Sequence, residues 1–321
     1  MGNISSIVGP TGSGKTGVVL EAATELLSRD TTRPIAVVSA DSRQVYAGIP
    51  VITGADIPPG FTNTALEYPL RSSFVHQDIP LTIFGVGIIS PLEDWSASHF
   101  AELFRAVLTE YSRPDDRIFV VGGTMLYQQS LDRAELLQSP GPKSEIRDRA
   151  EQMDLNELQA WLTSIDKSAF ERMNESDRSN PRRLVRAIER AVSPPPTASS
   201  QEAVIDHEWY GIMPNIEQLA DNIAVRVRER FDAGAVEEAE KLRSLIEDKG
   251  LNPRKIPAWS ACGVQYLDAL SQGELTKQQC VEQWAASELR YVKRQLTWWK
   301  KQQDITWFSE KQALLEKLLQ L

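Results

Sequence analysis

Eight residues near the N-terminus have the types and the spacing of a phosphate-binding loop. The sequence Gly9-Pro10-Thr11-Gly12-Ser13-Gly14-Lys15-Thr16 fits the pattern G-x-x-x-x-G-K-[ST] and lies between an apolar run and an amphipathic one. The glycines allow backbone N–H groups to converge on phosphate oxygens, and the N-terminal end of a following helix attracts anions. Lys15 would add a positive charge, and the hydroxyl of Thr16 would reach Mg²⁺. The loop predicts binding of a di- or triphosphate, or of a pyrophosphate group on another molecule.

A second group of polar residues follows the apolar run Ile35–Ser39. Asp41 comes first after Ala40, and Ser42, Arg43 and Gln44 come next. The carboxyl end of a parallel strand would place Asp41 at the edge of the sheet, beside the phosphate-binding loop. There its carboxylate could organise magnesium, act as a general base or cap a short helix. The polar residues beside it are typical of an edge that binds an acceptor substrate.

A third group follows the apolar run 118–121 and disfavours nucleotide hydrolysis. An ordinary NTPase carries an Asp after such a strand to organise magnesium and water, but here the run leads into Gly122-Gly123-Thr124. The two glycines allow close backbone approach, and the hydroxyl of Thr124 would then point at the same sheet edge. A simple turn is the alternative interpretation. The sequence also has no Asn-Lys-x-Asp segment that would recognise guanine.

Short apolar runs alternate with amphipathic segments, a pattern that would position these groups on a parallel sheet. Strands are predicted at residues 4–8, 35–39, 81–88, 118–121 and 207–213, and helices at 15–28 and 97–111. This alternation indicates βαβ units and therefore an α/β fold. We expect a P-loop NTPase-like parallel sheet flanked by helices, with an inserted all-helical subdomain and a helical C-terminal region.

The predicted domain boundaries follow from a change of pattern after the fourth strand. Residues 125–192 show helical spacing without a convincing strand, and Pro194-Pro195-Pro196 then ends any helix. After residue 213 the pattern is again helical, with a break at 250–257. We predict a core formed by residues 1–124 and 199–321, and a helical insertion at 125–198.

The overall charge disfavours a protein that is held to nucleic acid by its net charge. The 321 residues include 35 Lys and Arg against 44 Asp and Glu, which gives a formal net charge of -9. Basic residues nevertheless cluster, with five arginines and one glutamate at 178–190 and five basic residues and one acid at 288–301. Two distant cysteines and three histidines support neither a disulfide framework nor a zinc site. We expect a cytoplasmic monomer without a membrane span.

Five motifs, taken in order, resemble those of the tRNA dimethylallyltransferases, also called tRNA isopentenyltransferases. The motifs are GPTGSGKT, SADSRQVY, VGGTMLY, NPRRLVRAIE and YVKRQLTWW, and they cover nearly the whole chain. The resemblance implies transfer of a dimethylallyl group from dimethylallyl diphosphate to the N6 amine of adenosine 37. This nucleotide lies beside the anticodon in tRNAs that read codons beginning with U, and diphosphate would be released.

The resemblance also implies roles for the residues at matching positions. The loop 9–16 would hold the donor diphosphate, with Lys15 and a Mg²⁺ ion at Thr16 neutralising the developing charge. Asp41 would be the general base that takes the N6 proton, and Thr124 would lie at the same reaction channel. Contacts with the tRNA anticodon stem-loop would involve Asp41, Ser42, Arg43, Gln44, Thr124, Arg147, Arg182, Arg183, Leu184, Val185 and Arg186.

The chain departs from the family pattern at Thr53–Pro58, Phe84–Ser96, Cys262–Val264 and Glu288-Leu289. Other activities compete with the main hypothesis. An adenylate isopentenyltransferase would use the same donor with a free adenine nucleotide, but it would not need the helical insertion or the arginine cluster. A small-molecule kinase would bind ATP in the loop, but the missing Asp after 118–121 disfavours it. A protein that only binds RNA would not need Lys15, Thr16 and Asp41.

Overall fold

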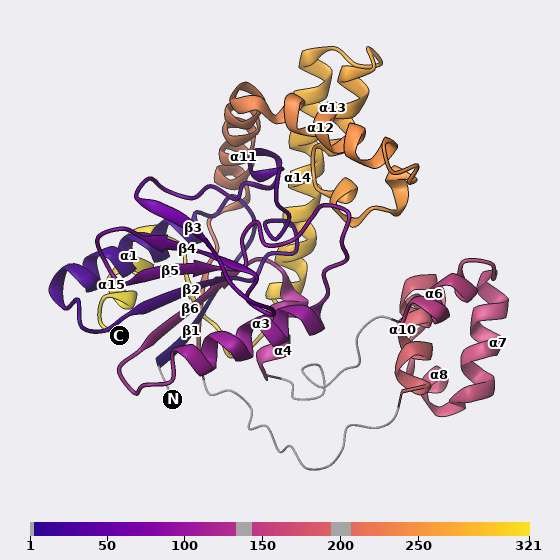
Figure 1. Cartoon of the computed structure of the whole chain (residues 1–321), viewed down its shortest axis with the longest axis horizontal. Coiled ribbons are helices and arrows are strands. Elements are labelled where there is room, and N and C mark those ends of the chain that lie inside the picture. Colours follow the sequence, from indigo (N-terminus) through magenta and orange to yellow (C-terminus); the bar gives the residue numbers. More distant parts are fainter. Residues whose placement is uncertain (1–2, 133–142, 194–206) are drawn as a thin grey trace. The chain divides into compact units, whose positions relative to one another are not determined.

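The computed structural model describes residues 3–132, 143–193 and 207–321, which form two compact units (Figure 1). Residues 3–132 and 207–321 form the core unit, and residues 143–193 form the helical unit. The predicted connector at 194–196 lies outside the described residues.

Helix α4 (Met125–Asp132) belongs to the core unit, although the sequence prediction assigns it to the insertion. It contacts α3 (Ala97–Glu110), where the ring of Tyr127 stacks on Phe100 with 4.9 Å between the ring centroids. Leu131 is also fully buried. The apolar residues of α4 are therefore part of the main core, which moves the predicted start of the insertion to a position after Asp132.

Within the described residues, a mixed sheet of eight strands forms the centre of the core unit. In spatial order the strands are β3 (Phe61–Ala65), β4 (Ser72–His76), β5 (Leu81–Phe84), β2 (Ile35–Ser39), β6 (Arg117–Gly122), β1 (Asn3–Val8), β7 (Glu208–Ile212) and β8 (Thr306–Phe308). From β5 to β8 each strand is parallel to its neighbour. The predicted α/β core is therefore confirmed.

One edge of the sheet departs from the predicted parallel arrangement. There, β3 pairs antiparallel with β4, and β4 pairs antiparallel with β5. Strand β3 carries the polar sequence FTNTA and is largely exposed, so no buried alternation marks it. The predicted strand at 81–88 also ends early, because Gly85 turns the backbone with a φ of 79°.

Helices cover the sheet and leave one edge for the functional groups (Figure 1). Helices α1 (Lys15–Arg29) and α15 (Lys311–Leu318) pack together, and their apolar residues join Val37 and Phe119 in one hydrophobic cluster. The alternate strand residues, such as Val120, are fully buried as well, as expected of a sheet covered on both faces. The carboxyl ends of the parallel strands therefore bring their following loops together at one edge.

A largely helical region follows β7 and completes the core unit. It includes α11 (Ile216–Arg230), a kinked segment at Phe231–Ala235, α12 (Val236–Glu247), short 3₁₀ turns at Pro253–Lys255 and Pro257–Ser260, α13 (Val264–Ser271) and α14 (Lys277–Trp299). Helix α14 contacts α11, α13 and α4. Its buried residues include Trp284 and Trp299, which are both fully inaccessible to solvent. Trp299 therefore belongs to the core.

The short helix α2 (Pro50–Thr53) is held by a carboxylate of α12. The backbone N–H groups of Val51 and Ile52 donate to Glu238 at 2.9 and 2.8 Å. These N–H groups have no partner within so short a helix, so Glu238 acts as their cap. The contact fixes α2 against the helical region.

The helical unit has its own apolar core. It comprises α6 (Ser144–Ala150), α7 (Leu155–Ile165), α8 (Lys167–Arg172), α9 (Glu175–Arg178) and α10 (Pro181–Ala191). Leu158, Leu162, Leu184 and Ile188 form the centre of this core. The side chain of Asn180 accepts the first N–H groups of α10, so Asn180 is its N-cap.

One carboxylate is fully buried in the helical unit and joins two of its helices. Glu189 accepts the backbone N–H of Lys143 and the Nε of Arg147, both at 3.0 Å, and also the Nη1 of Arg186 at 3.0 Å. Burial alone would raise the pKa of Glu189, but these donors hold it below its usual value. Glu189 therefore ties the start of α6 to the end of α10.

Replacing Glu189 with Leu should destabilise the helical unit by about 1–3 kcal/mol, because a half-buried N–H and two guanidinium groups lose their acceptor. Hydrogen exchange of amides in 143–193 should become faster. The control is Glu171→Leu, since the side chain of Glu171 forms an exposed ion pair with Lys167; loss of this pair should change stability by less than about 0.5 kcal/mol. Equal exchange in Glu189→Leu and wild type would show that the buried carboxylate adds no net stability.

Candidate active site

The glycine-rich loop between β1 and α1 has a backbone geometry suited to phosphate binding. Gly12 and Gly14 have φ angles of 81° and 85°, which residues with a side chain rarely adopt. Gly14 is the N-cap residue of α1, and no side chain forms a cap hydrogen bond there. The first amides of α1 are thus available to an anion at the positive end of the helix.

Lys15 is buried at the start of α1 and is held inside the loop. Its Nζ donates to the carbonyl of Pro10 at 2.8 Å. Burial lowers the pKa of Lys15 to about 8; the charge of Asp41 opposes this shift, and Arg226 adds to it. The neighbouring Thr16 is exposed. Lys15 is therefore a cation in a confined space, where a bound anion would favour its charged form.

The loops after β2 and β6 are joined by hydrogen bonds around Asp41 and Thr124. The backbone N–H of Ser42 donates to the Thr124 hydroxyl at 3.0 Å. Oδ1 of Asp41 accepts the backbone N–H of Arg43 at 2.8 Å and, more weakly, that of Gln44 at 3.4 Å. Asp41 thus stabilises the turn at 42–45, where the alternative left open by the sequence was the cap of a short helix. Only one of its oxygens makes these bonds, and Oδ2 lies outside them.

Glycines allow the close packing at the end of β6. A Cβ on Gly122 would lie 2.1 Å from the carbonyl oxygen of Ala40, and one on Gly123 would lie 2.4 Å from Nε2 of Gln295. That Nε2 donates to the Gly123 carbonyl at 3.1 Å, while Oε1 of Gln295 accepts the N–H of Thr11 at 2.9 Å. Gln295 belongs to the YVKRQLTWW motif, but its bridging position could not be inferred from that motif.

Two residues predicted to bind the acceptor also make contacts within the protein. Nη1 of Arg43 donates to the Pro257 carbonyl at 2.7 Å, and Nε2 of Gln44 donates to the Gly54 carbonyl at 2.7 Å. Both residues still line the cavity described next. Their polar groups therefore fix the loop after β2, in addition to any contact with a ligand.

A cavity of about 700 Å³ opens between the glycine-rich loop, the end of β2 and the helical region. Lys15 and Asp41 line it, together with Arg226 and Arg230 of α11, which the sequence analysis did not predict. The two arginines are one helical turn apart and share a face of α11. The spacing of the two arginines is visible in the sequence, but the sequence does not show which face of α11 lies against the glycine-rich loop.

The cavity also contains a tyrosine whose hydroxyl stays protonated. Burial raises the pKa of Tyr291 to about 12, and the charge of Asp41 contributes to the shift. Tyr291 lies on α14 one turn before Gln295. It therefore offers a neutral hydroxyl near the carboxylate of Asp41 and the guanidinium groups of Arg43 and Arg294.

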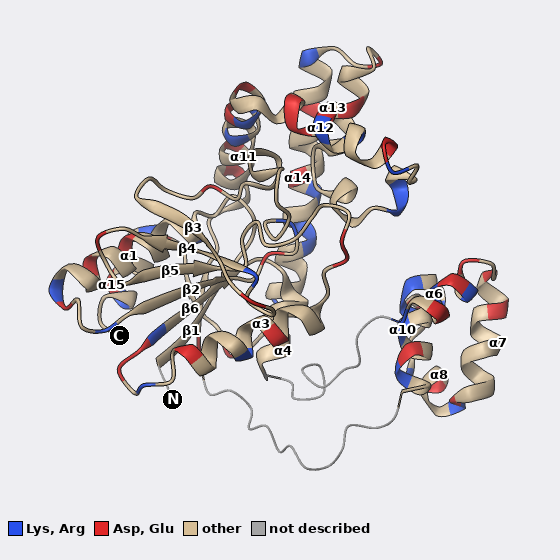
Figure 2. Ribbon diagram, viewed as in Figure 1, with Lys and Arg blue, Asp and Glu red and all other residues tan. Residues whose placement is uncertain are grey.

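Four of the arginines predicted to contact tRNA, Arg147, Arg182, Arg183 and Arg186, lie on α6 and α10 of the helical unit (Figure 2). Arg147 and Arg186 bind the buried Glu189. Arg183 forms an ion pair with Asp177, but 56% of its side chain remains exposed. Arg182 is exposed at the start of α10. Part of the cluster thus stabilises the unit, and Arg182 and Arg183 are the members most open to solvent.

Two further residues of that predicted group are apolar and face inward. Leu184 is 0% exposed in the core of the helical unit, so its side chain is not accessible to tRNA. Val185 is half-buried and packs against the same core.

The second basic segment, on α14 and just after it, is mostly exposed and includes Arg290, Lys293, Arg294, Lys300 and Lys301.

Among the described residues, no group of three or more His, Cys, Asp or Glu side chains is placed to hold a metal ion. In the same part of the chain, no helix combines the length and the apolar character needed to cross a membrane.

Comparisons with solved structures show the fold. The chain is similar to the full-length tRNA isopentenylpyrophosphate transferase of Bacillus halodurans, with 24% identity and a TM-score of 0.62 over 99% of this chain and 94% of that one. It is also similar to a eukaryotic dimethylallyltransferase acting on tRNA, with 21% identity and a TM-score of 0.68 over 96% and 73%.

Comparisons of sequence show the family as well as the fold. The chain is 29% identical to a tRNA dimethylallyltransferase of Maridesulfovibrio salexigens, over 94% of this chain and 91% of that protein. It is 30% identical to tRNA dimethylallyltransferase 2 of Geotalea daltonii, over 94% and 86%. The model of the IPP transferase family matches residues 79–302, which is most of the chain. Together with the cavity at the glycine-rich loop, these matches show that the chain belongs to the IPP transferase family.

Proposed function

We propose that the protein transfers a dimethylallyl group from dimethylallyl diphosphate to the N6 amine of adenosine 37 in tRNAs that read codons beginning with U. One observation carries the proposal: a single cavity holds the glycine-rich loop with Lys15 and Arg226 as well as the carboxylate of Asp41. The loop and the cations suit a diphosphate leaving group. Asp41 suits an acceptor that must lose a proton.

The donor diphosphate would bind the first amides of α1 and Lys15, with Arg226 on the other side. Thr16 would hold Mg²⁺ together with phosphate oxygens, since its hydroxyl is exposed and takes part in none of the hydrogen bonds found among the described residues. A bound Mg²⁺ would neutralise charge on the leaving group. An ion held mainly by phosphate and water needs no cluster of carboxylates.

The chemistry requires help from a base, because the lone pair of the adenine amine is delocalised into the ring. The allylic C–O bond breaks and its electron pair leaves on diphosphate, while the new C–N bond forms at N6. The N6 proton passes to Oδ2 of Asp41, whose Oδ1 is oriented by the backbone N–H of Arg43. The cations across the cavity stabilise the departing diphosphate.

The basic surfaces support tRNA as the acceptor. Arg182 and Arg183 on α10, and the exposed basic residues of α14, suit contacts with RNA phosphates. A free adenine nucleotide would need neither surface, which disfavours an adenylate isopentenyltransferase. The target adenine must leave the anticodon-loop stack, which costs a few kcal/mol and is cheapest for an unpaired base. The cytoplasm, where tRNA is modified, would be the site of action.

Incubation with radiolabelled dimethylallyl diphosphate, Mg²⁺ and unmodified tRNA, AMP or ATP in turn should label tRNA alone. Asp41→Asn should slow transfer by roughly 10²–10⁴-fold, because it removes the base and keeps an oxygen for the Arg43 N–H. Binding of inorganic diphosphate, measured by calorimetry, is the control and should persist. Label in AMP but not in tRNA would contradict the proposal, and an active Asp41→Asn would reduce Asp41 to a cap.

Charge reversal at Arg182, which is exposed on α10, should weaken tRNA binding and reduce its dependence on salt. Electrophoretic mobility shifts at several salt concentrations would measure both effects. Arg172→Glu on α8 is the matched control, since it makes the same charge change on a neighbouring helix. If the two variants bind tRNA equally well, the first turn of α10 is only a solvated surface.

The lowered pKa of Lys15 predicts a pH dependence of diphosphate binding. Below pH 8 the lysine is charged, but above this value it must take up a proton on binding. Affinity should then fall by roughly tenfold per pH unit. In Lys15→Arg the guanidinium stays charged, so this loss should disappear, while the ionisation of diphosphate itself is the same for both proteins. If the affinities of the wild type and of Lys15→Arg, measured by calorimetry, change with pH in the same way, titration of Lys15 does not contribute to diphosphate binding.

A further inference from the structure

The guanidinium group of Arg230 is buried with only part of its hydrogen-bonding capacity used. Arg230 is 7% exposed, and its Nη1 donates to Oε1 of Glu288 at 3.0 Å and to the Ile52 carbonyl at 3.4 Å. Its Nε and Nη2 are buried without a partner, as is Oε2 of Glu288. Unpaired charged donors inside a protein are costly, so the ion pair alone does not account for this arrangement.

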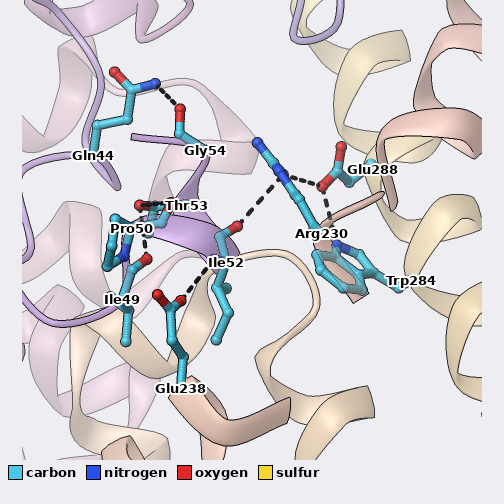
Figure 3. Close-up of polar contacts among 10 residues, drawn as sticks. All are labelled: Gln44, Ile49, Pro50, Ile52, Thr53, Gly54, Arg230, Glu238, Trp284 and Glu288. Atoms are coloured by element: carbon cyan, nitrogen blue, oxygen red, sulfur yellow. Dashed lines mark hydrogen bonds and ion pairs between the residues drawn. The ribbon is translucent and has the colours of Figure 1, made fainter. Parts of the chain in front are cut away.

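The surrounding residues hold the guanidinium in one orientation (Figure 3). Glu288 is 2% exposed and also accepts the indole Nε1–H of Trp284 at 3.0 Å. Ile52 lies in α2, which Glu238 caps from the other side. The side of Arg230 that is bonded to protein is thus fixed by α14 and by α2, which Glu238 of α12 caps. The free side points toward Gly54, as Figure 3 shows.

At Gly54 the free side of Arg230 meets Arg226. A Cβ on Gly54 would lie 1.6 Å from Nη2 of Arg230 and 2.2 Å from Nη2 of Arg226, so both groups occupy the space that a side chain would need. Both arginines line the cavity that contains Lys15. Burial and the neighbouring Arg226 lower the pKa of Arg230 to about 10, so it remains charged at neutral pH. Two adjacent guanidinium groups repel each other unless an anion lies between them.

We propose that Arg230 is a second diphosphate-binding arginine, which donates its free Nε and Nη2 groups to the donor beside Arg226 and is positioned by Glu288. The proposal rests on the proposed function for the identity of the anion. It assigns the ion pair a positioning role: Glu288 uses one edge of the guanidinium and leaves the other for phosphate oxygens. On departure of the leaving group, Arg230 would stabilise the charge on its oxygens.

Calorimetric titration with inorganic diphosphate tests this assignment. Arg230→Met should weaken binding by roughly 10- to 100-fold, the range expected for loss of a charge-assisted contact. The matched control is Arg228→Met, which removes an exposed arginine of the same helix and should leave affinity unchanged. Affinity of Arg230→Met within twofold of wild type would overturn the proposal.

A double variant separates ligand binding from a structural role. Arg230→Met leaves Glu288 buried without its cation, so Arg230→Met combined with Glu288→Gln removes both charges, keeps an acceptor for the indole N–H of Trp284 and should recover thermal stability. Diphosphate binding should stay as weak as in the single variant, because the ligand contact is still missing. Recovery of wild-type affinity in the double variant would show that Arg230 serves only to neutralise Glu288.

Steady-state kinetics distinguish this proposal from the proposed function. Arg230→Met should raise the KM for dimethylallyl diphosphate and leave the KM for tRNA near its wild-type value. A raised KM for tRNA alone would overturn the role of Arg230. If the wild-type protein binds diphosphate but prenylates no tRNA, the proposed function fails, while the calorimetric comparison of the variants still decides what Arg230 binds.

Discussion

The side-chain amide of Gln295 joins three segments that are distant in the chain. Its oxygen accepts the N–H of Thr11 and its nitrogen donates to the carbonyl of Gly123, so α14 is bonded both to the glycine-rich loop and to the end of β6. Gln295 is 1% exposed, and loss of either bond would leave a buried polar group unpaired at a cost of about 1–3 kcal/mol. The geometry of an N-terminal loop therefore depends on a helix near the C-terminus.

The same region concentrates positive charge that is poorly solvated. Burial lowers the pKa of both Lys15 and Arg230, which means that the folded protein disfavours their charged forms relative to water. Such a site is unfavourable when empty and favourable once an anion binds, because binding stabilises only the folded state. Asp41 faces these cations from the end of β2, so one cavity contains both a site for negative charge and a proton acceptor.

The sequence predicts best the groups whose surroundings are local. The glycine-rich loop and Asp41 lie where expected because each directly follows a buried strand, and parallel strands end at one edge. The hairpin of β3 and β4 escapes prediction because its outer strand is polar and exposed. Arg226 and Arg230 escape it because the face of a helix that meets a cavity is decided by packing with residues far away in sequence. For the same reason, the inward position of Leu184 could not be inferred from its place in a basic motif.

The bond between Lys15 and the Pro10 carbonyl has a consequence for selectivity. An ammonium group has three N–H donors, and this bond uses one of them and orients the other two. A ligand with one charged oxygen can accept from only part of the donors of the loop. A ligand with several charged oxygens can accept from Lys15 and from the helix amides at the same time. The orientation of the lysine thus favours diphosphates over smaller anions.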